Sequence, residues 1–108
     1  MKPLLVLTTV GAGFDARSIA QALVEARVAA CVNILDGVHS VYRWEGKVTG
    51  DDEQLLVIKS ADGRVEALRE LLFSLHPYDV PEFVVVPIES MSAAYEEWFR
   101  SAVAEPPL

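Results

Sequence analysis

A pair of strand-forming segments occupies the middle of the chain and restricts the folds open to it. Residues 29–35 are rich in strand formers, and residues 38–45 alternate between two sets of side chains after a break at Asp36-Gly37. Residues 54–60 alternate in the same way, after a polar stretch that begins near Glu45. Residues 29–45 and residues 54–60 thus predict the two strands of a long antiparallel hairpin, with a bulge or turn at the break in the first strand. An antiparallel sheet is therefore predicted at the centre of the fold.

Two more strands and three helices are predicted around this hairpin. The segments at residues 4–9 and 82–88 are rich in strand formers. Helical spacing of apolar residues places Tyr95 and Trp98 inward in the last helix. The helices are expected to begin at Asp15, Asp62 and Ser90 or Ser92. The order βαββαβα predicts an α+β fold, the ferredoxin-like α/β sandwich, with a four-stranded antiparallel sheet, its first and third strands central and the helices on one face.

Length and charge exclude several classes of protein. The chain has 108 residues, which fits a single domain spanning residues 1–108. Its formal net charge of -7 argues against binding to nucleic acid or to an anionic membrane, because both recruit clusters of Lys and Arg. The N-terminus lacks the pattern of a secretory signal, and the one cysteine, Cys31, excludes an internal disulfide. We therefore expect a cytoplasmic protein.

The share of apolar residues predicts an oligomer. Apolar residues make up 52% of the chain, and a mean hydropathy of +0.28 indicates more apolar surface than a small core can cover. A sheet with helices on one face leaves its other face bare, and that face would carry Tyr42, Trp44 or their neighbours. Contact with other copies would cover this face and protect the edge of the hairpin.

Three segments taken together resemble the CutA family, the divalent-cation tolerance proteins. They are ACVN at residues 30–33, VYRWEGK at residues 41–47 and HPYDVPE at residues 76–82, and the similarity extends from the first strand to Trp98. The resemblance implies a ferredoxin-like subunit in a tight homotrimer with sheets inside and helices outside, an architecture related to the PII signalling trimers. It also implies a role in tolerance to copper and other divalent ions, in metal binding or in signalling, with no established reaction.

The resemblance further implies where copper would bind. Copper-binding members use a cysteine on the first strand and a pair of histidines before the Pro-Tyr. The corresponding positions here are Thr8, Leu75 and His76, so only His76 remains of that set. A single histidine is a poor chelator, so we expect copper or zinc to bind weakly, with His76 and Cys31 as candidate ligands and further groups from a neighbouring chain or from water.

Both candidate ligands also fit ordinary structural roles. Cys31 lies within a predicted strand, where a free cysteine is usually a small buried residue. His76 precedes Pro77 at the predicted end of the second helix, where a protonated imidazole interacts favourably with the helix dipole. The sequence leaves the structural role and the metal role open for each residue.

Lys59 is the residue that most suggests a ligand pocket. It ends an apolar strand segment that would hide its charge, and a buried ammonium group needs a partner. Glu82 opens another strand, and Tyr78 and Trp44 are aromatic residues with polar groups. A cluster of Lys59, Glu82, Tyr78 and Trp44 would form a site for a small anion or another ligand, or else an ion pair that holds the trimer together.

No residue pattern in the chain indicates catalysis. The two histidines do not belong to a Ser-His-Asp pattern, and the glycines at 11 and 13 lack the Lys-Ser/Thr of a phosphate-binding loop. The main hypothesis is a trimeric divalent-cation tolerance protein that acts as a metal-response or signalling module rather than as an enzyme, with no certain cofactor. Two alternatives remain open: an enzyme or small-ligand binder with a pocket between subunits around Lys59, Glu82 and Tyr78, and a scaffold that anchors partners.

Overall fold

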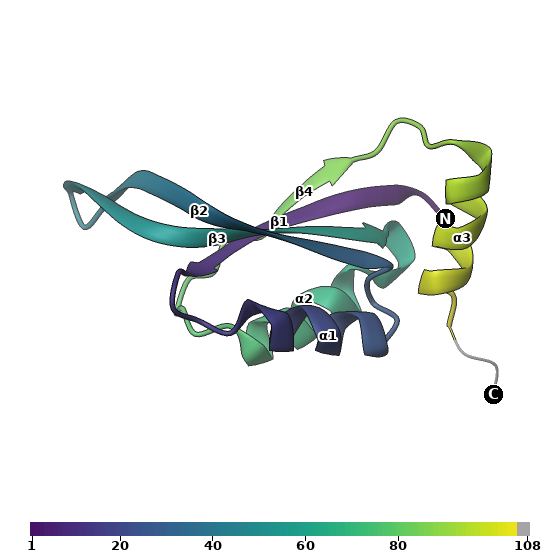
Figure 1. Cartoon of the computed structure of the whole chain (residues 1–108), viewed down its shortest axis with the longest axis horizontal. Coiled ribbons are helices and arrows are strands. Elements are labelled where there is room, and N and C mark those ends of the chain that lie inside the picture. The colour runs from purple at the N-terminus through teal and green to yellow at the C-terminus, as the bar shows by residue number, and fades with distance from the viewer. Residues whose placement is uncertain (106–108) are drawn as a thin grey trace.

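A four-stranded antiparallel sheet organises the computed structural model, which describes residues 1–105 (Figure 1). Its strands, β1 (Pro3–Gly11), β2 (Cys31–Trp44), β3 (Lys47–Ala61) and β4 (Val84–Pro87), follow the order β2-β3-β1-β4. The first and third strands are therefore central, as the sequence predicts. The last three residues of the predicted domain, 106–108, lie outside the described part of the chain.

Helices α1 (Ala16–Glu25) and α2 (Val65–Leu75) cover one face of the sheet (Figure 1). Side chains alternate along each strand, so every second residue of β1, and of β3 from Gln54 to Ser60, is buried beneath these helices. The core between the layers contains Leu4, Val6, Val10, Ile19, Leu23, Leu56, Ile58, Leu68 and Leu72. No helix in the described residues is long and apolar enough to span a membrane.

The third helix, α3 (Ala93–Val103), does not join this layer, contrary to the prediction that the helices share one face. It lies at the end of the sheet near the N-terminus (Figure 1). Its Phe99 and Val103 form a second, smaller core with residues at the adjacent ends of β2 and β3. The expectation that Tyr95 and Trp98 face inward is wrong, because they are 38% and 45% exposed. Phe99 is buried instead, because the side of α3 that packs against the fold is displaced by one residue from the side predicted to face inward.

The face of the sheet away from α1 and α2 is only partly covered, and we call it the open face. Residues that lie directly opposite one another in antiparallel strands point to the same side of the sheet. Lys59 of β3 lies opposite Cys31 of β2 and Leu5 of β1, and Leu5 lies opposite Val86 of β4. The open face carries Leu5, Leu7, Cys31, Asn33, Leu55, Val57, Lys59, Val84 and Val86.

The hairpin of β2 and β3 extends past the helices as a two-stranded projection, residues 38–53, which we call the arm (Figure 1). The pairing shifts between Leu35 and Val38, which confirms the predicted irregularity there. Both residues of the two-residue closing turn, Glu45 and Gly46, have positive φ angles of 50° and 78°. Such angles give the turn the same twist as the two strands, so β2 and β3 remain paired with each other up to the tip of the arm.

Three predicted boundaries move in the structure. The strand β3 begins at Lys47 rather than at Gln54, because backbone pairing with β2 continues through polar residues that are exposed on the arm. The strand β4 is shorter than residues 82–88 and spans only Val84–Pro87. Asp62 does not cap α2: it lies in the short 3-10 helix η1 (Asp62–Arg64), where its carboxylate accepts the backbone N–H groups of Lys2 and Gly63.

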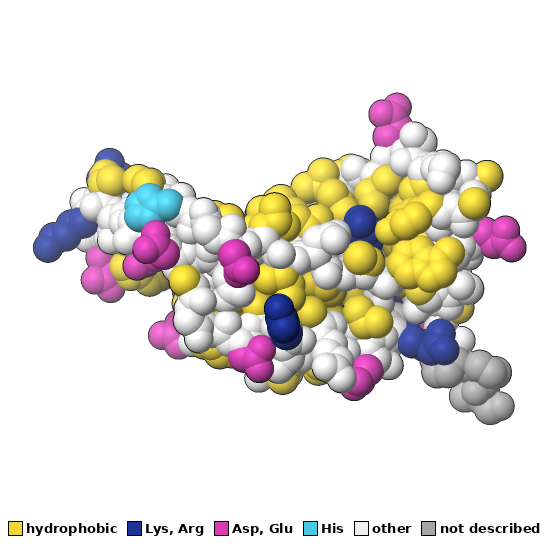
Figure 2. All heavy atoms as spheres, in the orientation of Figure 1, with side chains coloured by type: hydrophobic (Ala, Val, Ile, Leu, Met, Phe, Trp, Pro, Cys, Tyr) yellow, Lys and Arg dark blue, Asp and Glu magenta, His cyan; other side chains and the backbone are white. Residues whose placement is uncertain are grey.

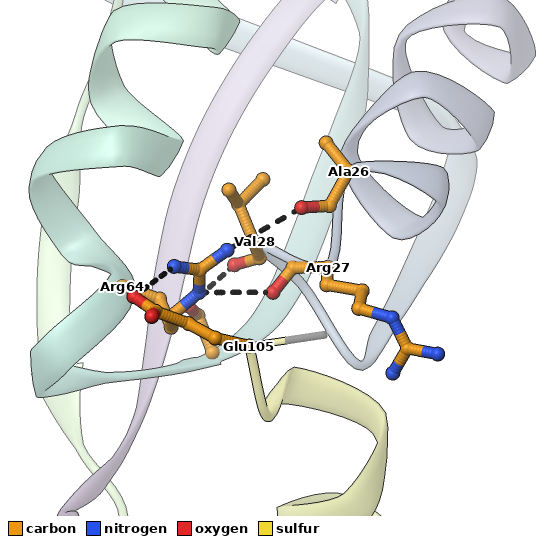
Figure 3. Close-up of polar contacts among 6 residues, drawn as sticks. Ala26, Arg27, Val28, Arg64 and Glu105 are labelled. Carbon is orange, nitrogen blue, oxygen red and sulfur yellow. Dashed lines mark hydrogen bonds and ion pairs between the residues drawn. The ribbon is translucent and has the colours of Figure 1, made fainter. Parts of the chain in front are cut away.

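The predicted cap of the first helix is confirmed. Asp15 precedes α1, and its carboxylate accepts the backbone N–H of Ser18 at 3.3 Å. The other end of α1 is held by Arg64, whose guanidinium donates from Nε to the carbonyl of Arg27 at 3.1 Å and from Nη2 to that of Ala26 at 3.4 Å (Figure 3). Its Nη1 pairs with Glu105 at 3.1 Å. Arg64 thus joins the end of α1, the start of α2 and the segment after α3.

Candidate functional site

A groove of about 870 Å³ lies between the arm and the segment that joins α2 to β4. Its lining residues include three aromatic side chains and five carboxylates, and no Lys, Arg or His among the described residues. The aromatic residues are Tyr42, Trp44 and Tyr78, and the acidic residues are Asp51, Asp52, Glu53, Asp79 and Glu82. A groove with this lining favours a positively charged group and disfavours an anion.

One hydrogen bond connects the two walls of the groove. The hydroxyl of Tyr78 donates to Oε2 of Glu53 at 2.8 Å, and Glu53 is buried, with 6% of its surface exposed. Burial raises the pKa of Tyr78 to about 12, and its hydrogen bond to the Glu53 carboxylate and the charge of that carboxylate act in the same direction. Tyr78 is therefore a hydrogen-bond donor near neutral pH and does not act as a base.

A second tyrosine is bound to a carboxylate in the same way. The hydroxyl of Tyr42 donates to a carboxylate oxygen of Asp51, across the two strands of the arm. This hydrogen bond is the main reason that the pKa of Tyr42 is raised. Asp52 is bound instead to Nδ1 of His39 at 2.8 Å.

Glu82 differs from Asp51, Asp52 and Glu53 because its carboxylate accepts no side-chain hydrogen bond and forms no ion pair among residues 1–105. Its pKa is raised, first by desolvation against the groove wall and then by the charge of Glu53. Glu82 is nevertheless an exposed residue in one copy. Two carboxylates that repel one another, here the buried Glu53 and the exposed Glu82, would both be stabilised by a cation between them.

The structure brings together three of the four residues expected to form a pocket. Trp44, Tyr78 and Glu82 line the groove, but Lys59 does not. Lys59 lies on the open face, where its Nζ donates to Oδ1 of Asn33 at 3.1 Å and sits 5.7 Å from the centre of the Tyr95 ring. Within one copy the groove therefore lacks the positive charge that a site for a small anion would need.

His76 ends α2, as the sequence predicts, and is buried. Its Nδ1 accepts the backbone N–H of Tyr78 at 3.1 Å, so the ring proton lies on Nε2, which donates to the carbonyl of Thr9 at 2.8 Å. Both ring nitrogens are thus used in hydrogen bonds that hold the turn carrying Tyr78. Binding of a metal ion to His76 would break one of these bonds.

Cys31 stands apart from His76 and is not a core residue. It begins β2 on the open face, is partly buried, and its Sγ lies 3.9 Å from Oδ1 of Asn33. Cys31 is level with Leu5 of β1 across the sheet, whereas His76 is bound to Thr9 further along the same strand. In residues 1–105 no group of three or more His, Cys, Asp or Glu is arranged to hold a metal ion.

Thr8 occupies the position where the resemblance implies a copper-binding cysteine. Its side chain points into the core under the helices and is fully buried. Its Oγ1 has no hydrogen-bond partner among residues 1–105. The Thr8 side chain is therefore enclosed within the fold rather than directed into the groove.

The residues of the groove that the sequence interpretation missed are Tyr42, Asp51 and Glu53. The acidic residues 51–53 lie in the polar stretch that the sequence places before the strand at 54–60, but they belong to β3. The period of two seen in residues 54–60 continues back through Glu53 and Asp51, and this signal could have placed both carboxylates on the same side of the strand.

Comparison with known proteins gives a consistent result. The family model described as CutA1 divalent ion tolerance protein matches residues 4–102. The divalent-cation tolerance protein CutA of Thermus thermophilus is 48% identical over 96 residues, which are 89% of this chain and 93% of that protein. The chloroplastic protein CutA of Arabidopsis thaliana is 41% identical over 99 residues, 92% of this chain but only 54% of that protein.

Solved structures of related proteins have the same fold. The divalent cation tolerance protein of Thermus thermophilus superposes with a TM-score of 0.90 at 45% identity, and covers 94% of this chain and 99% of its own. CutA1 of Oryza sativa superposes with a TM-score of 0.89 at 38% identity, over 98% of this chain and 97% of its own. The chain therefore belongs to the family of CutA1 divalent ion tolerance proteins.

Proposed function

We propose that the chain acts as a homotrimer whose copies meet through the open face. The observation that carries this proposal is the apolar surface left uncovered in one copy: Val84 and Val86 of β4 are 46% and 37% exposed, and Trp98 of α3 is 45% exposed. Figure 2 shows hydrophobic side chains gathered over β1, β4 and α3. A continuous apolar surface of this kind marks an interface. The arm, which has no core of its own, would lie against a neighbouring copy.

Light scattering or sedimentation of the full chain tests the assembly. We expect a mass about three times the 11.8 kDa of one chain. The variant Val86→Glu places a charge on the open face and should dissociate the trimer. The matched control is Val24→Glu, because Val24 has a similar exposure, 42%, but lies on α1 in the helical layer. A wild-type chain that remains a monomer at micromolar concentration would overturn the proposal.

We further propose that the trimer is a binding or metal-response module rather than an enzyme. Relatives carry the name divalent-cation tolerance protein, which describes a response to metal ions and no reaction. The tyrosine hydroxyls of the groove are already bound to carboxylates and have raised pKa values, so they do not supply a base near neutral pH. Binding of a positively charged group is the chemistry that the groove lining supports.

Copper and zinc are proposed to bind weakly. The nitrogens of His76 are both in hydrogen bonds, and Cys31 lies elsewhere on the sheet, so a tight site would have to be assembled from groups of several copies or from water. Calorimetric titration of the trimer with each ion should give dissociation constants above roughly 1 µM. Submicromolar binding that persists in His76→Ala would contradict this expectation.

A cytoplasmic location is also proposed, on the strength of the single cysteine. Relatives differ in this respect, since one from Arabidopsis thaliana is named chloroplastic and one from Archaeoglobus fulgidus is named periplasmic. Cell fractionation with an antibody against the chain tests the location directly, and recovery outside the cytoplasmic fraction would contradict it.

A further inference from the structure

The groove is lined by negative charges, whereas Lys59 carries a positive charge that is paired with no carboxylate of residues 1–105. Five carboxylates line the groove with no Lys or Arg of residues 1–105 among its lining residues, and Glu53 and Glu82 are near enough that the charge of one affects the other. Lys59 carries a positive charge on an apolar face, and its two close neighbours, Asn33 and Tyr95, are both uncharged. If the open face is covered in a trimer, the ammonium group of Lys59 would lose water and would need a carboxylate in exchange.

Lys59 cannot meet the groove of its own copy. Glu53 and Lys59 lie on the same strand, six residues apart, and each residue of a strand advances about 3.3 Å. The two positions are therefore separated by roughly 20 Å along β3, which is more than a lysine side chain can span. Pairing across the sheet gives the same result, because Glu53 lies opposite Gly11 at the end of β1 and Lys59 lies opposite Leu5.

We propose that Lys59 of one copy enters the groove of the next copy and completes it, with its ammonium group beside the carboxylates of Glu53 and Glu82 and near the rings of Trp44 and Tyr78. This inference rests on the proposed trimer and adds the occupant of the groove. The support for it is charge complementarity between two surfaces of the same chain, each of which lacks its counterpart within one copy. The groove is thus incomplete until a neighbouring copy is bound.

The symmetry of such a contact agrees with a ring. The donor, Lys59, and the acceptor groove occupy different places on the chain, so the interface joins unlike surfaces head to tail. Repeated contacts of this type close into a ring when the rotation between copies allows it. A trimer would then contain three identical lysine–groove contacts, one at each interface.

Coupled substitutions in the full chain test the contact. Lys59→Met and Glu82→Gln should each lower the melting temperature of the trimer by on the order of 10 °C, because each leaves a sheltered charge unpaired. The double variant should melt no lower than the worse single variant, since the same contact has already been lost. Lys59→Arg keeps the charge and should retain most of the stability. The control Glu70→Gln removes an exposed carboxylate of α2 and should leave the melting temperature unchanged.

Exchanging the charges of Lys59 and Glu82 is a control for variants that lose stability only because they fold poorly. Lys59→Glu and Glu82→Lys should each weaken the trimer, and the chain that carries both should regain stability because the pair is restored in reverse. Lys59→Glu combined with Glu70→Lys should show no recovery. Trimer mass by light scattering is measured for every variant beside its melting temperature.

The outcomes separate this inference from the trimer on which it rests. A wild-type monomer overturns the trimer and the contact together. A wild-type trimer in which the Lys59 and Glu82 effects are additive, and in which the charge exchange gives no recovery, overturns the contact alone. A trimer whose stability is unchanged by Lys59→Met but is raised by millimolar putrescine also overturns it, because the groove then holds a free amine instead of a neighbouring lysine.

Discussion

Tyr78 donates its hydroxyl hydrogen to Glu53 over 2.8 Å, and this bond joins the segment after α2 to the base of the arm. The same tyrosine is held from behind by His76, whose Nδ1 accepts its backbone N–H. Tyr78 is thereby fixed at both its backbone and its hydroxyl, and the width of the groove depends on these two contacts.

The variant Tyr78→Phe should destabilise the fold. It removes the hydroxyl that satisfies the buried Glu53 carboxylate, and a buried acceptor without its donor costs about 1–3 kcal/mol. Urea unfolding measures the difference. The control Tyr42→Phe breaks a similar bond to Asp51 on the exposed arm and should cost less. Equal losses for the two variants would mean that burial of Glu53 has no effect on the outcome.

Alkaline pH should weaken the wild-type protein through the same tyrosine. The pKa of Tyr78 is about 12 in the folded protein and 10.0 for an ordinary tyrosine, so the folded state favours the protonated hydroxyl. This contribution to stability is complete below pH 10 and is lost as the pH rises from 10 to 12. Unfolding free energies measured across this range should fall more steeply for the wild type than for Tyr78→Phe.

Thr8→Val should stabilise the protein. The Thr8 hydroxyl is fully buried and its Oγ1 has no partner in the described part of the chain, whereas valine has nearly the same shape and no polar group to satisfy. A gain of about 1 kcal/mol is expected in urea unfolding. Thr8→Ser keeps the hydroxyl and removes a methyl group, so it should destabilise the fold. Loss of stability in Thr8→Val would indicate that the hydroxyl has a partner in solution.

Arg64→Lys should cost about 1–3 kcal/mol of unfolding free energy, because an ammonium group cannot donate at once to the two carbonyls and the carboxylate that the guanidinium reaches (Figure 3). Thermal unfolding is the measurement. Arg69→Lys serves as the control, since Arg69 is more exposed and pairs only with Glu66 on its own helix. A similar effect at both positions would show that Arg64 does not join the three segments.

His76→Ala should lower stability without any metal ion present. It removes hydrogen bonds to Thr9 and Tyr78 at a buried position, and the expected cost is about 1–3 kcal/mol. Thermal melts in the presence of a chelator test this. If the variant matches the wild type with chelator and differs only when copper is added, the role of His76 is in metal binding and not in holding the turn.

The sequence predicted those parts of the fold whose residues are placed by local rules. The Asp15 cap, the break at Asp36-Gly37 and the central position of β1 and β3 follow from spacing, turn chemistry and the handedness of chain crossings. The beginning of β3 was missed because residues of the arm have no core beneath them. Their side chains are free to be polar on both faces, and only backbone pairing makes them a strand.

Tertiary contacts account for the other differences. The spacing in α3 allows more than one inward face, and only the contact with the ends of β2 and β3 selects Phe99 and Val103 over Tyr95 and Trp98. Trp44, Tyr78 and Glu82 of the predicted pocket line one groove, whereas Lys59 of the same copy lies on the open face. A linear sequence does not say which charges belong to one copy and which to its neighbour.

The irregularity in β2 has a consequence for the whole arm. Leu35 lies opposite Leu55 and Val38 lies opposite Glu53, so β2 advances by three residues where β3 advances by two. The alternation of side chains along β2 therefore changes phase at this point. Odd-numbered side chains of β2 point to the open face before the shift. Even-numbered side chains, including Tyr42 and Trp44, point to the open face after it. Without this bulge, a strand that alternated regularly from Leu35 onward would turn Tyr42 and Trp44 to the opposite side of the sheet, away from the carboxylates of Asp51 and Glu53.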